Sequence, residues 1–202
     1  VLRGYPIPDW RQLEGTPERK IKGKFDELSK VRKMRESIPD WMDELGVKEL
    51  GEALWTKEIA AQNQQAKVIL RVNTLKTTKE KLRALLMDLN IETEYIKDNN
   101  DALVLTERAN VFLTDAFKQG FFEVQDASSQ LVARFLDVQP GMRVVDTCAG
   151  AGGKTLHMAS IMENKGQLIA MDLYESKLKQ LKLRAKRNGA FNIEYRIIDT
   201  TK

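Results

Sequence analysis

The stretch "RVVDTCAGAGGKT", residues 143–155, decides the fold. Apolar residues and Asp146 lead into a run of small residues, which lets a backbone approach a ligand closely. An apolar helix, the strand "GQLIAMD" (166–172), a second helix and the strand "YRIID" (195–199) follow. Strands that alternate with helices predict parallel βαβ units with right-handed crossovers and helices on both faces. We therefore expect an α/β fold, one half of a doubly wound, Rossmann-like domain.

Three ligand-binding templates compete for the glycine loop. The P-loop pattern G-x-x-x-x-G-K-[ST] matches at its end, residues 153–155, but Cys148 replaces its first glycine. A β-carbon there would crowd the turn that wraps phosphates. The dinucleotide fingerprint G-x-G-x-x-G fits Gly150 and Gly152 and fails at Thr155. Both templates are near misses.

The third template is an aspartate at a strand end followed by a Gly-x-Gly turn. It is typical of class I methyltransferases, which bind S-adenosylmethionine, a cofactor without phosphates. The helix that begins near Gly153 can face the carboxylate of such a cofactor. Asp172 ends the second strand, where a carboxylate is placed to bind both ribose hydroxyls. Asp199 ends the third strand, and Asp146 the first, so three carboxylates share the ligand-binding edge.

The preceding segment predicts a second α/β unit. Strand-like runs occur at residues 67–75, 92–97, 102–107 and 121–126. An amphipathic helix at 78–90, capped by Thr77 or Thr78, and a helix at 110–120, closed by Gly120, separate them. The first of these helices places four leucines on one face: Leu82, Leu85, Leu86 and Leu89. The order βαββαβ predicts a ferredoxin-like fold.

The N-terminal third reads as helical and basic. We divide the chain into a basic linker or helical segment (1–36), a helical segment (37–65), a ferredoxin-like subdomain (66–125) and half of a cofactor-binding domain (126–202). In the helical segment, Pro39 is expected at the start of the first helix and Gly46 near its end. Trp41 and Trp55 are expected as core anchors, with an apolar stripe formed by Leu50, Leu54 and Ile59.

The composition is that of a globular protein without internal disulfide bonds. Of the 202 residues, 42% are hydrophobic and 31% charged, as in a globular protein. The single cysteine, Cys148, rules out an internal disulfide and favours a reducing, cytoplasmic location. A net charge of +4 is compatible with a nucleic-acid partner. No residues have metal-ligand spacing. A chain that starts at Val1 and stops after a buried strand is expected to be a fragment.

Four motifs resemble, in order, those of the Sun/Fmu-type RNA (cytosine-C5) methyltransferases. "DTCAGAGGKT" (146–155) is similar to that family's D-x-C-A-A-P-G-G-K-T, with Gly-Ala in place of Ala-Pro. "ILRVNTLK" (69–76) resembles R-x-N-x-L-K, "FFEVQDASSQLVA" (121–133) resembles V-Q-D-x-x-S-Q, and "SIPDWM" (37–42) resembles P-x-W. The resemblance covers roughly residues 37–202 and implies a class I methyltransferase domain behind an RNA-presenting subdomain.

The resemblance also implies site residues. The S-adenosylmethionine contacts would be Cys148, Ala149, Gly150, Ala151, Gly152, Gly153, Lys154, Asp172 and Asp199. The RNA path would pass Arg71, Asn73 and Lys76. The substrate would be RNA, with ribosomal RNA favoured over transfer RNA. Such enzymes add a cysteine thiolate to C6 of cytosine, and that nucleophile would lie beyond Lys202, because Cys148 maps to the cofactor loop. No catalytic residue is therefore assigned, and the chain alone is expected to be inactive.

Several readings stay open. Arg71, Asn73 and Lys76 can instead form a strand end with surface ion pairs. Lys154 can simply reach solvent, and the segment 125–130 can line a subdomain junction or, at Asp126, cap a helix. The basic helix at 176–190 is expected to cover the sheet and carry a solvated face, with RNA contact as the alternative. His157 is expected to be packed or partly exposed, and not catalytic or metal-bound. Rival functions are a non-catalytic RNA-binding module and a P-loop-like nucleotide hydrolase.

Overall fold

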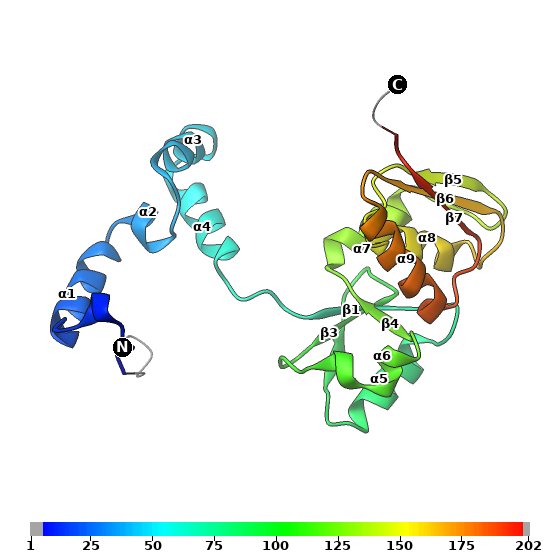
Figure 1. Ribbon diagram of the computed structural model, residues 1–202, viewed down its shortest axis with the longest axis horizontal. Coiled ribbons are helices and arrows are strands. Elements are labelled where there is room, and N and C mark those ends of the chain that lie inside the picture. The colour runs from blue at the N-terminus through cyan, green and yellow to red at the C-terminus, as the bar shows by residue number, and fades with distance from the viewer. Residues whose placement is uncertain (1–5, 200–202) are drawn as a thin grey trace. The chain divides into compact units, whose positions relative to one another are not determined.

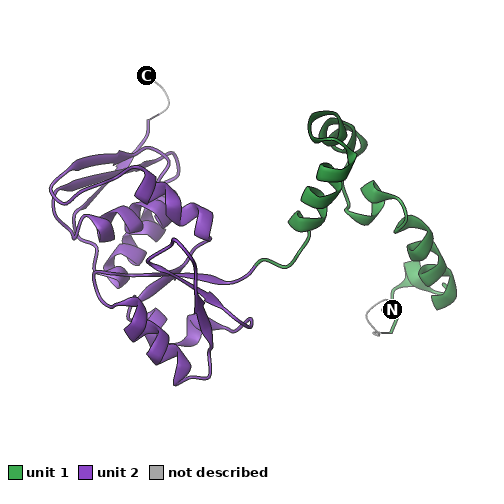
Figure 2. Cartoon of the chain, turned by 180° about the vertical axis from the view of Figure 1, so that it is seen from behind, with its two compact units in different colours: residues 1–66 green, residues 67–202 purple. Residues whose placement is uncertain are grey.

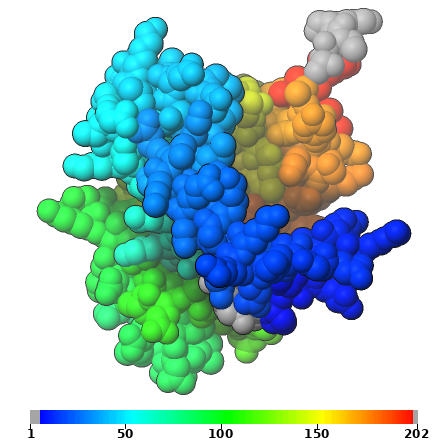
Figure 3. All heavy atoms as spheres, turned by 90° about the vertical axis from the view of Figure 1, so that its left-hand side faces the viewer, coloured from blue at the N-terminus to red at the C-terminus, as the bar shows by residue number. Residues whose placement is uncertain are grey.

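The computed structural model describes residues 6–199, and the chain divides into two compact units between Ala66 and Lys67 (Figure 2). The first unit is helical, and its surface is drawn in blue to cyan in Figure 3. Its elements are the 3₁₀ turn η1 (Arg11–Leu13) and helices α1 (Glu18–Leu28), α2 (Arg32–Arg35), α3 (Asp40–Leu50) and α4 (Glu52–Gln62). Helices α1, α2 and α3 contain no buried residue.

Three predictions for the helical segment were wrong. Helix α3 begins after Pro39, as expected, but it continues past Gly46 to Leu50 and is followed by Gly51, whose φ is +77°. Gly46 lies inside the helix, and the indole of Trp55 packs directly against it. A β-carbon at Gly46 would approach the ring atoms to 2.3 Å, so the packing requires glycine there. Trp55 is the expected anchor, whereas Trp41 is 62% exposed. In the expected apolar stripe only Ile59 is buried, and Leu50 and Leu54 are exposed.

The second unit starts with a ferredoxin-like subdomain. Its elements are β1 (Ile69–Val72), α5 (Lys79–Met87), β2 (Thr93–Tyr95), β3 (Ala102–Leu105), η2 (Val111–Leu113), α6 (Asp115–Lys118) and β4 (Phe122–Val124). The strands form an antiparallel sheet in the order β2-β3-β1-β4. Thr78 caps α5 by accepting a hydrogen bond from the N–H of Lys81. Leu82 and Leu86 enter the core, while Leu85 and Leu89, predicted on the same face, are exposed.

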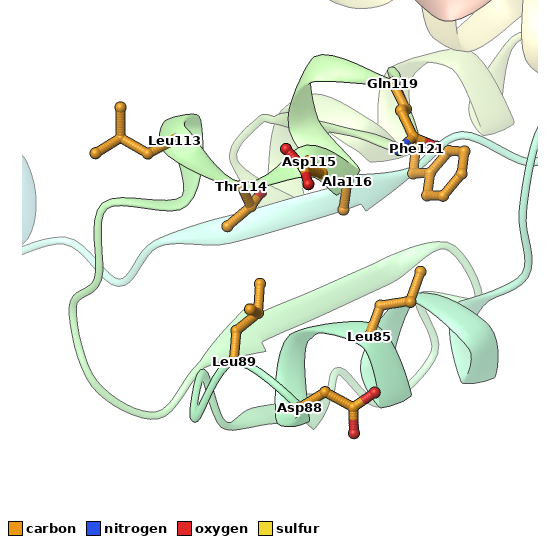
Figure 4. Close-up of a pocket in the computed structure, with 9 residues that line it drawn as sticks. All are labelled: Leu85, Asp88, Leu89, Leu113, Thr114, Asp115, Ala116, Gln119 and Phe121. Carbon is orange, nitrogen blue, oxygen red and sulfur yellow. The ribbon is translucent and has the colours of Figure 1, made fainter.

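Leu85 and Leu89 instead line an open groove of about 430 Å³ between α5 and the η2–α6 segment (Figure 4). The close-up shows Leu113 and Thr114 on the opposite side of the groove, with Asp88 and Asp115 also along it. None of the predicted site residues lies there. The groove is therefore separate from the glycine loop.

The second unit continues with the half-domain that the glycine loop predicts. It contains α7 (Ala127–Phe135), β5 (Arg143–Asp146), α8 (Gly153–Ile161), β6 (Gln167–Asp172), α9 (Glu175–Asn188) and β7 (Ile193–Ile197). Strands β5, β6 and β7 are parallel in that order. Asp126 caps α7 by accepting from the N–H of Ser128, which supports the capping interpretation.

Within residues 6–199, helices α7, α8 and α9 all cover the same face of this sheet (Figure 1). One core cluster joins Ala133 of α7, Leu156 of α8 and Leu181 of α9 to Leu168 and Ala170 of β6. The prediction of helices on both faces was therefore wrong for this part of the chain. The reason is topological, because two right-handed crossovers that step in one direction place both helices on one side.

The ferredoxin-like subdomain and the half-domain pack directly on each other. Gly120 lies so close to the end of α9 that a β-carbon would approach the carbonyl oxygen of Arg187 to 2.1 Å. The Nδ2 group of Asn73 donates to the carbonyls of Gly120 (2.7 Å) and Asn188 (2.8 Å). The two subdomains therefore share a polar, closely packed interface within one compact unit. No helix in the described part of the chain is long and apolar enough to cross a membrane.

Candidate cofactor-binding site

The loop between β5 and α8 is held by the aspartate that precedes it. Asp146 Oδ1 accepts from the backbone N–H of Cys148 (3.2 Å), and Oδ2 accepts from the hydroxyl of Thr155 (2.7 Å). The N–H of Ala149 donates to the carbonyl of Met171 on β6 (2.9 Å). Asp146 thus closes both ends of the loop onto the strand edge. Its two hydrogen bonds therefore stabilise the conformation of the loop.

The two glycines of the turn are required for different reasons. Gly150 has a φ of +52°, but a β-carbon there would meet no atom within 4 Å, so only its backbone conformation favours glycine. Gly152 has a φ of +90°, and a β-carbon there would lie 2.0 Å from Cδ1 of Leu181 on α9. Gly152 therefore lets helix α9 pack directly beneath the loop.

The turn leaves a set of amide donors at the start of α8. Within residues 6–199, the N–H groups of Gly153, Lys154 and Thr155 donate to no backbone or side-chain acceptor. Such unsatisfied donors, aligned with the positive end of the helix dipole, form a site for an anionic group. The residues present therefore fit the carboxylate of a methionine-derived cofactor.

Asp172 faces the same turn from the end of β6. Its Oδ2 accepts from the N–H of Gly150 (2.8 Å) and its Oδ1 from the N–H of Tyr174 (2.9 Å). The amides of Tyr174 and Gly150 stabilise the carboxylate and hold its pKa below the ordinary value. Each oxygen keeps a lone pair, so the group can still accept hydrogen bonds from a ribose.

A hollow of about 600 Å³ lies beside Asp172, between the ends of β6 and β7. It is lined by residues at or just after the ends of the two strands: Leu173, Tyr174, Ile197, Ile198 and Asp199. Leucine, isoleucine and tyrosine side chains line it together with one carboxylate, a mixture of apolar and polar groups that suits a purine ring. The sequence analysis assigned Asp199 but missed the four other residues. Their only signal was their position at or directly after the strand ends.

The remaining loop residues differ in exposure. Ala149 and Gly152 are buried, Gly150, Ala151 and Gly153 are partly buried, and Cys148 and Lys154 are exposed. The Thr155 side chain is fully buried and already donates to Asp146. A P-loop needs that hydroxyl for a magnesium ion. The geometry therefore disfavours the nucleotide hydrolase reading.

The residues assigned to RNA contact lie at the subdomain interface. Arg71 is 2% exposed and donates to the side-chain carbonyl of Gln125 (2.5 Å) and to the backbone carbonyl of Gly153. Burial lowers the pKa of Arg71 to about 10, against the opposing effect of nearby Glu123. Asn73 is 4% exposed. These placements favour support of the loop over direct contact with RNA.

Lys76 is exposed, but its ammonium group is engaged with backbone across the interface. It donates to the carbonyls of Gln119 (2.8 Å) and Arg187 (2.7 Å).

The interface residues Glu123 and Arg184 were not assigned by the sequence analysis. In residues 6–199, the structure contains no group of three or more His, Cys, Asp or Glu side chains that could hold a metal ion.

Two family models match this chain, and the first of them begins in the helical unit. The model for the ferredoxin-like domain of RsmF/B-like methyltransferases matches residues 38–112. The model for 16S rRNA methyltransferase RsmB/F matches residues 133–202. The two matches fall in the order that the sequence motifs predict.

Curated relatives and solved structures agree with these matches. A probable ribosomal RNA small subunit methyltransferase B from Synechocystis is 35% identical over 78% of this chain and 36% of its own length. Its Bacillus subtilis counterpart is 32% identical over 95% of this chain and 42% of its own length. The chain thus spans about two fifths of these relatives.

Two solved structures from Pyrococcus horikoshii share the fold. A methyltransferase homologue is 27% identical with a TM-score of 0.76, covering 82% of this chain and 54% of that chain. NSun6, crystallised with SFG, has the same TM-score at 18% identity, over 80% of this chain and 65% of that chain. Motifs, fold and both family models agree, and the chain belongs to the RsmB/F family of Sun/Fmu-type methyltransferases.

Proposed function

We propose that this chain is the cofactor-binding and RNA-presenting part of an S-adenosylmethionine-dependent rRNA (cytosine-C5) methyltransferase. The observation that carries the proposal is the joint geometry of the glycine loop and two strand ends. Free amides at the start of α8, the Asp172 carboxylate and the hollow beside it lie along one edge of a parallel sheet. Ligands of open α/β sheets bind at this edge.

Each part of the edge has a separate task. The amides of Gly153, Lys154 and Thr155 would bind the carboxylate of the methionine moiety. Asp172 would accept from the ribose hydroxyls, and the hollow with Tyr174 and Asp199 would hold the adenine ring. Bound S-adenosylmethionine supplies an electrophilic methyl group. The chain's own residues would fix the orientation of that group and shield it from water.

The cytosine chemistry rests on the family resemblance. Attack by C5 on a methyl group requires a thiolate that first adds to C6. Cys148 is the only cysteine of the chain, and its backbone is bonded to Asp146 inside the cofactor loop. We propose that Cys148 lines the cofactor site and is not the nucleophile, so this chain alone is expected to bind cofactor without turnover. Ribosomal RNA as the substrate and a cytoplasmic location are parts of the same proposal.

Calorimetric titration of this chain with S-adenosylhomocysteine tests the proposal. A parallel titration with Mg-ATP tests the P-loop alternative on the same sample. We expect S-adenosylhomocysteine to bind at one site and Mg-ATP to produce no heat beyond dilution. Binding of Mg-ATP alone, or of neither ligand, would contradict the proposed cofactor role of this chain.

A further inference from the structure

A buried carboxylate lies at the interface between the ferredoxin-like subdomain and helix α9. Glu123 of β4 is 3% exposed. Its Oε2 accepts from Arg184 (2.9 Å), and its Oε1 accepts from Arg187 and from Nδ2 of Asn188 (2.5 Å). Burial raises the pKa of the Glu123 carboxyl, but the charge and hydrogen bonds of Arg184, with Arg187 and Asn188, outweigh burial and keep the pKa below its usual value. The cluster is therefore a connection between charged groups at neutral pH.

The same connection reaches the cofactor loop. Arg184 Nη2 bonds to Glu123, while its Nη1 donates to the backbone carbonyl of Ala151 (2.7 Å). A second guanidinium does the same from β1, because Arg71 donates to the carbonyl of Gly153 and to Gln125. Two carbonyls of the glycine turn thus accept hydrogen bonds from arginines. Arg71 belongs to the ferredoxin-like subdomain, and Arg184 is paired with Glu123 of that subdomain.

These contacts fix the planes of two peptide groups. In a trans peptide the carbonyl and the N–H point in opposite directions. Anchoring the carbonyl of Gly153 to Arg71 therefore turns the free N–H of Lys154 away from the interface. The second peptide group joins Ala151 to Gly152. Its N–H donates to the carbonyl of Ala149 (2.9 Å), and its carbonyl accepts from Arg184. A glycine-rich turn has high conformational entropy, so such external bonds decide how often it has the binding geometry.

We propose that Arg184, held by Glu123, is a positioning residue for the cofactor loop, so that the ferredoxin-like subdomain controls cofactor affinity. The inference rests on the proposed function and deepens it. Neither side chain needs to touch the cofactor. Because coupling is reciprocal, bound cofactor in turn stabilises the subdomain interface. The subdomain thus has a task in cofactor binding as well as in presenting RNA.

Arg187 provides a matched control. It bonds to the same carboxylate and is similarly exposed, at 22% against 27% for Arg184, but it donates nothing to the loop. Arg184→Met and Arg187→Met therefore each remove one guanidinium from Glu123, and only the first releases the carbonyl of Ala151. Thermal melting of both variants measures the shared loss of interface stability.

The affinity for S-adenosylhomocysteine and the hydrogen exchange of amides 149–154 are the two readouts. We expect Arg184→Met to weaken binding about 5- to 10-fold, at the low end of coupling between linked sites, and Arg187→Met to change it less than about twofold. Exchange at the loop is expected to accelerate in Arg184→Met alone. Equal effects of the two substitutions on both readouts would overturn the inference.

The exchange measurement also separates this inference from the proposed function. If the unsubstituted chain binds no S-adenosylhomocysteine, the proposed cofactor role fails. Faster loop exchange in Arg184→Met than in Arg187→Met would still support the positioning role. Equal exchange in the two variants would refute it without reference to any ligand.

Discussion

Replacing Asp172 by alanine removes one carboxylate that has two partners and one proposed ligand. The side chain binds the amides of Gly150 and Tyr174 at 2.8 and 2.9 Å, and it would accept from the cofactor ribose. A hydrogen bond to a charged group is worth about 1.5–3 kcal/mol. We therefore expect Asp172→Ala to weaken S-adenosylhomocysteine binding by about 10- to 150-fold.

Two effects contribute to that loss, and a second substitution separates them. Asp172→Asn keeps one oxygen that can accept from an amide, but it removes the charge and one acceptor. If the ribose contact dominates, the asparagine variant loses most of the affinity while its melting temperature stays close to that of the unsubstituted chain. If the loop anchor dominates, affinity and melting temperature fall together in both variants.

Titration calorimetry near neutral pH provides the assay. Asp88→Ala is the control, because the exposed carboxylate of Asp88 has no hydrogen-bond or ion-pair partner within residues 6–199. The control is expected to bind as the unsubstituted chain does. An unchanged dissociation constant in Asp172→Ala would refute the assignment of this carboxylate to the ribose.

Three further predictions concern stability, and thermal or denaturant unfolding checks each one. Gly152→Ala is expected to lower the free energy of unfolding by about 1–3 kcal/mol, because the new methyl group collides with Leu181 of α9. In Gly150→Ala the methyl group meets open space, so only about 1 kcal/mol of backbone strain is expected. Equal losses of stability in the two variants would contradict this reasoning. Thr155→Val should cost about 1 kcal/mol by leaving a carboxylate oxygen unpaired, and unchanged stability would argue against that bond. The pKa of Glu123 is lower in the folded than in the unfolded chain, so its contribution is present above about pH 4.3 and disappears as the pH falls through the folded value; Glu123→Gln should lack this component, and an identical pH profile would count against it.

The sheet edge that carries the glycine loop and the strand-end aspartates could be predicted because its signals are local in sequence. The loop between β5 and α8, and the ends of β6 and β7, each combine a strand with the residues directly after it. In a parallel sheet such ends share one edge, so separate local patterns predict a common site. The ferredoxin-like order β2-β3-β1-β4 followed in the same way from the alternation of strands and helices.

The errors arose where packing decides between locally equal options. Gly46 and Gly51 are both plausible ends for α3, and only the packed indole of Trp55 shows that the first lies within the helix. Trp41 and Trp55 are equally hydrophobic, yet one is exposed and the other buried. The one-sided cover of the parallel sheet depends on strand order, which hydrophobic periodicity does not contain.

The arginines show most clearly what the sequence could not provide. Arg71 and Gly153 are 82 residues apart, and Arg184 and Glu123 are 61 apart, so no local pattern links them. A family motif placed Arg71 near RNA, and a basic helix placed Arg184 on a solvated face, because exposure is the ordinary state of arginine. Arg71 is buried and Arg184 is partly buried at one interface, which inverts that reading. A guanidinium that is removed from water needs acceptors, and backbone carbonyls of a glycine turn are acceptors that no side chain of the turn can shield. The same desolvation that makes these arginines costly to bury therefore ties the glycine loop to the neighbouring subdomain.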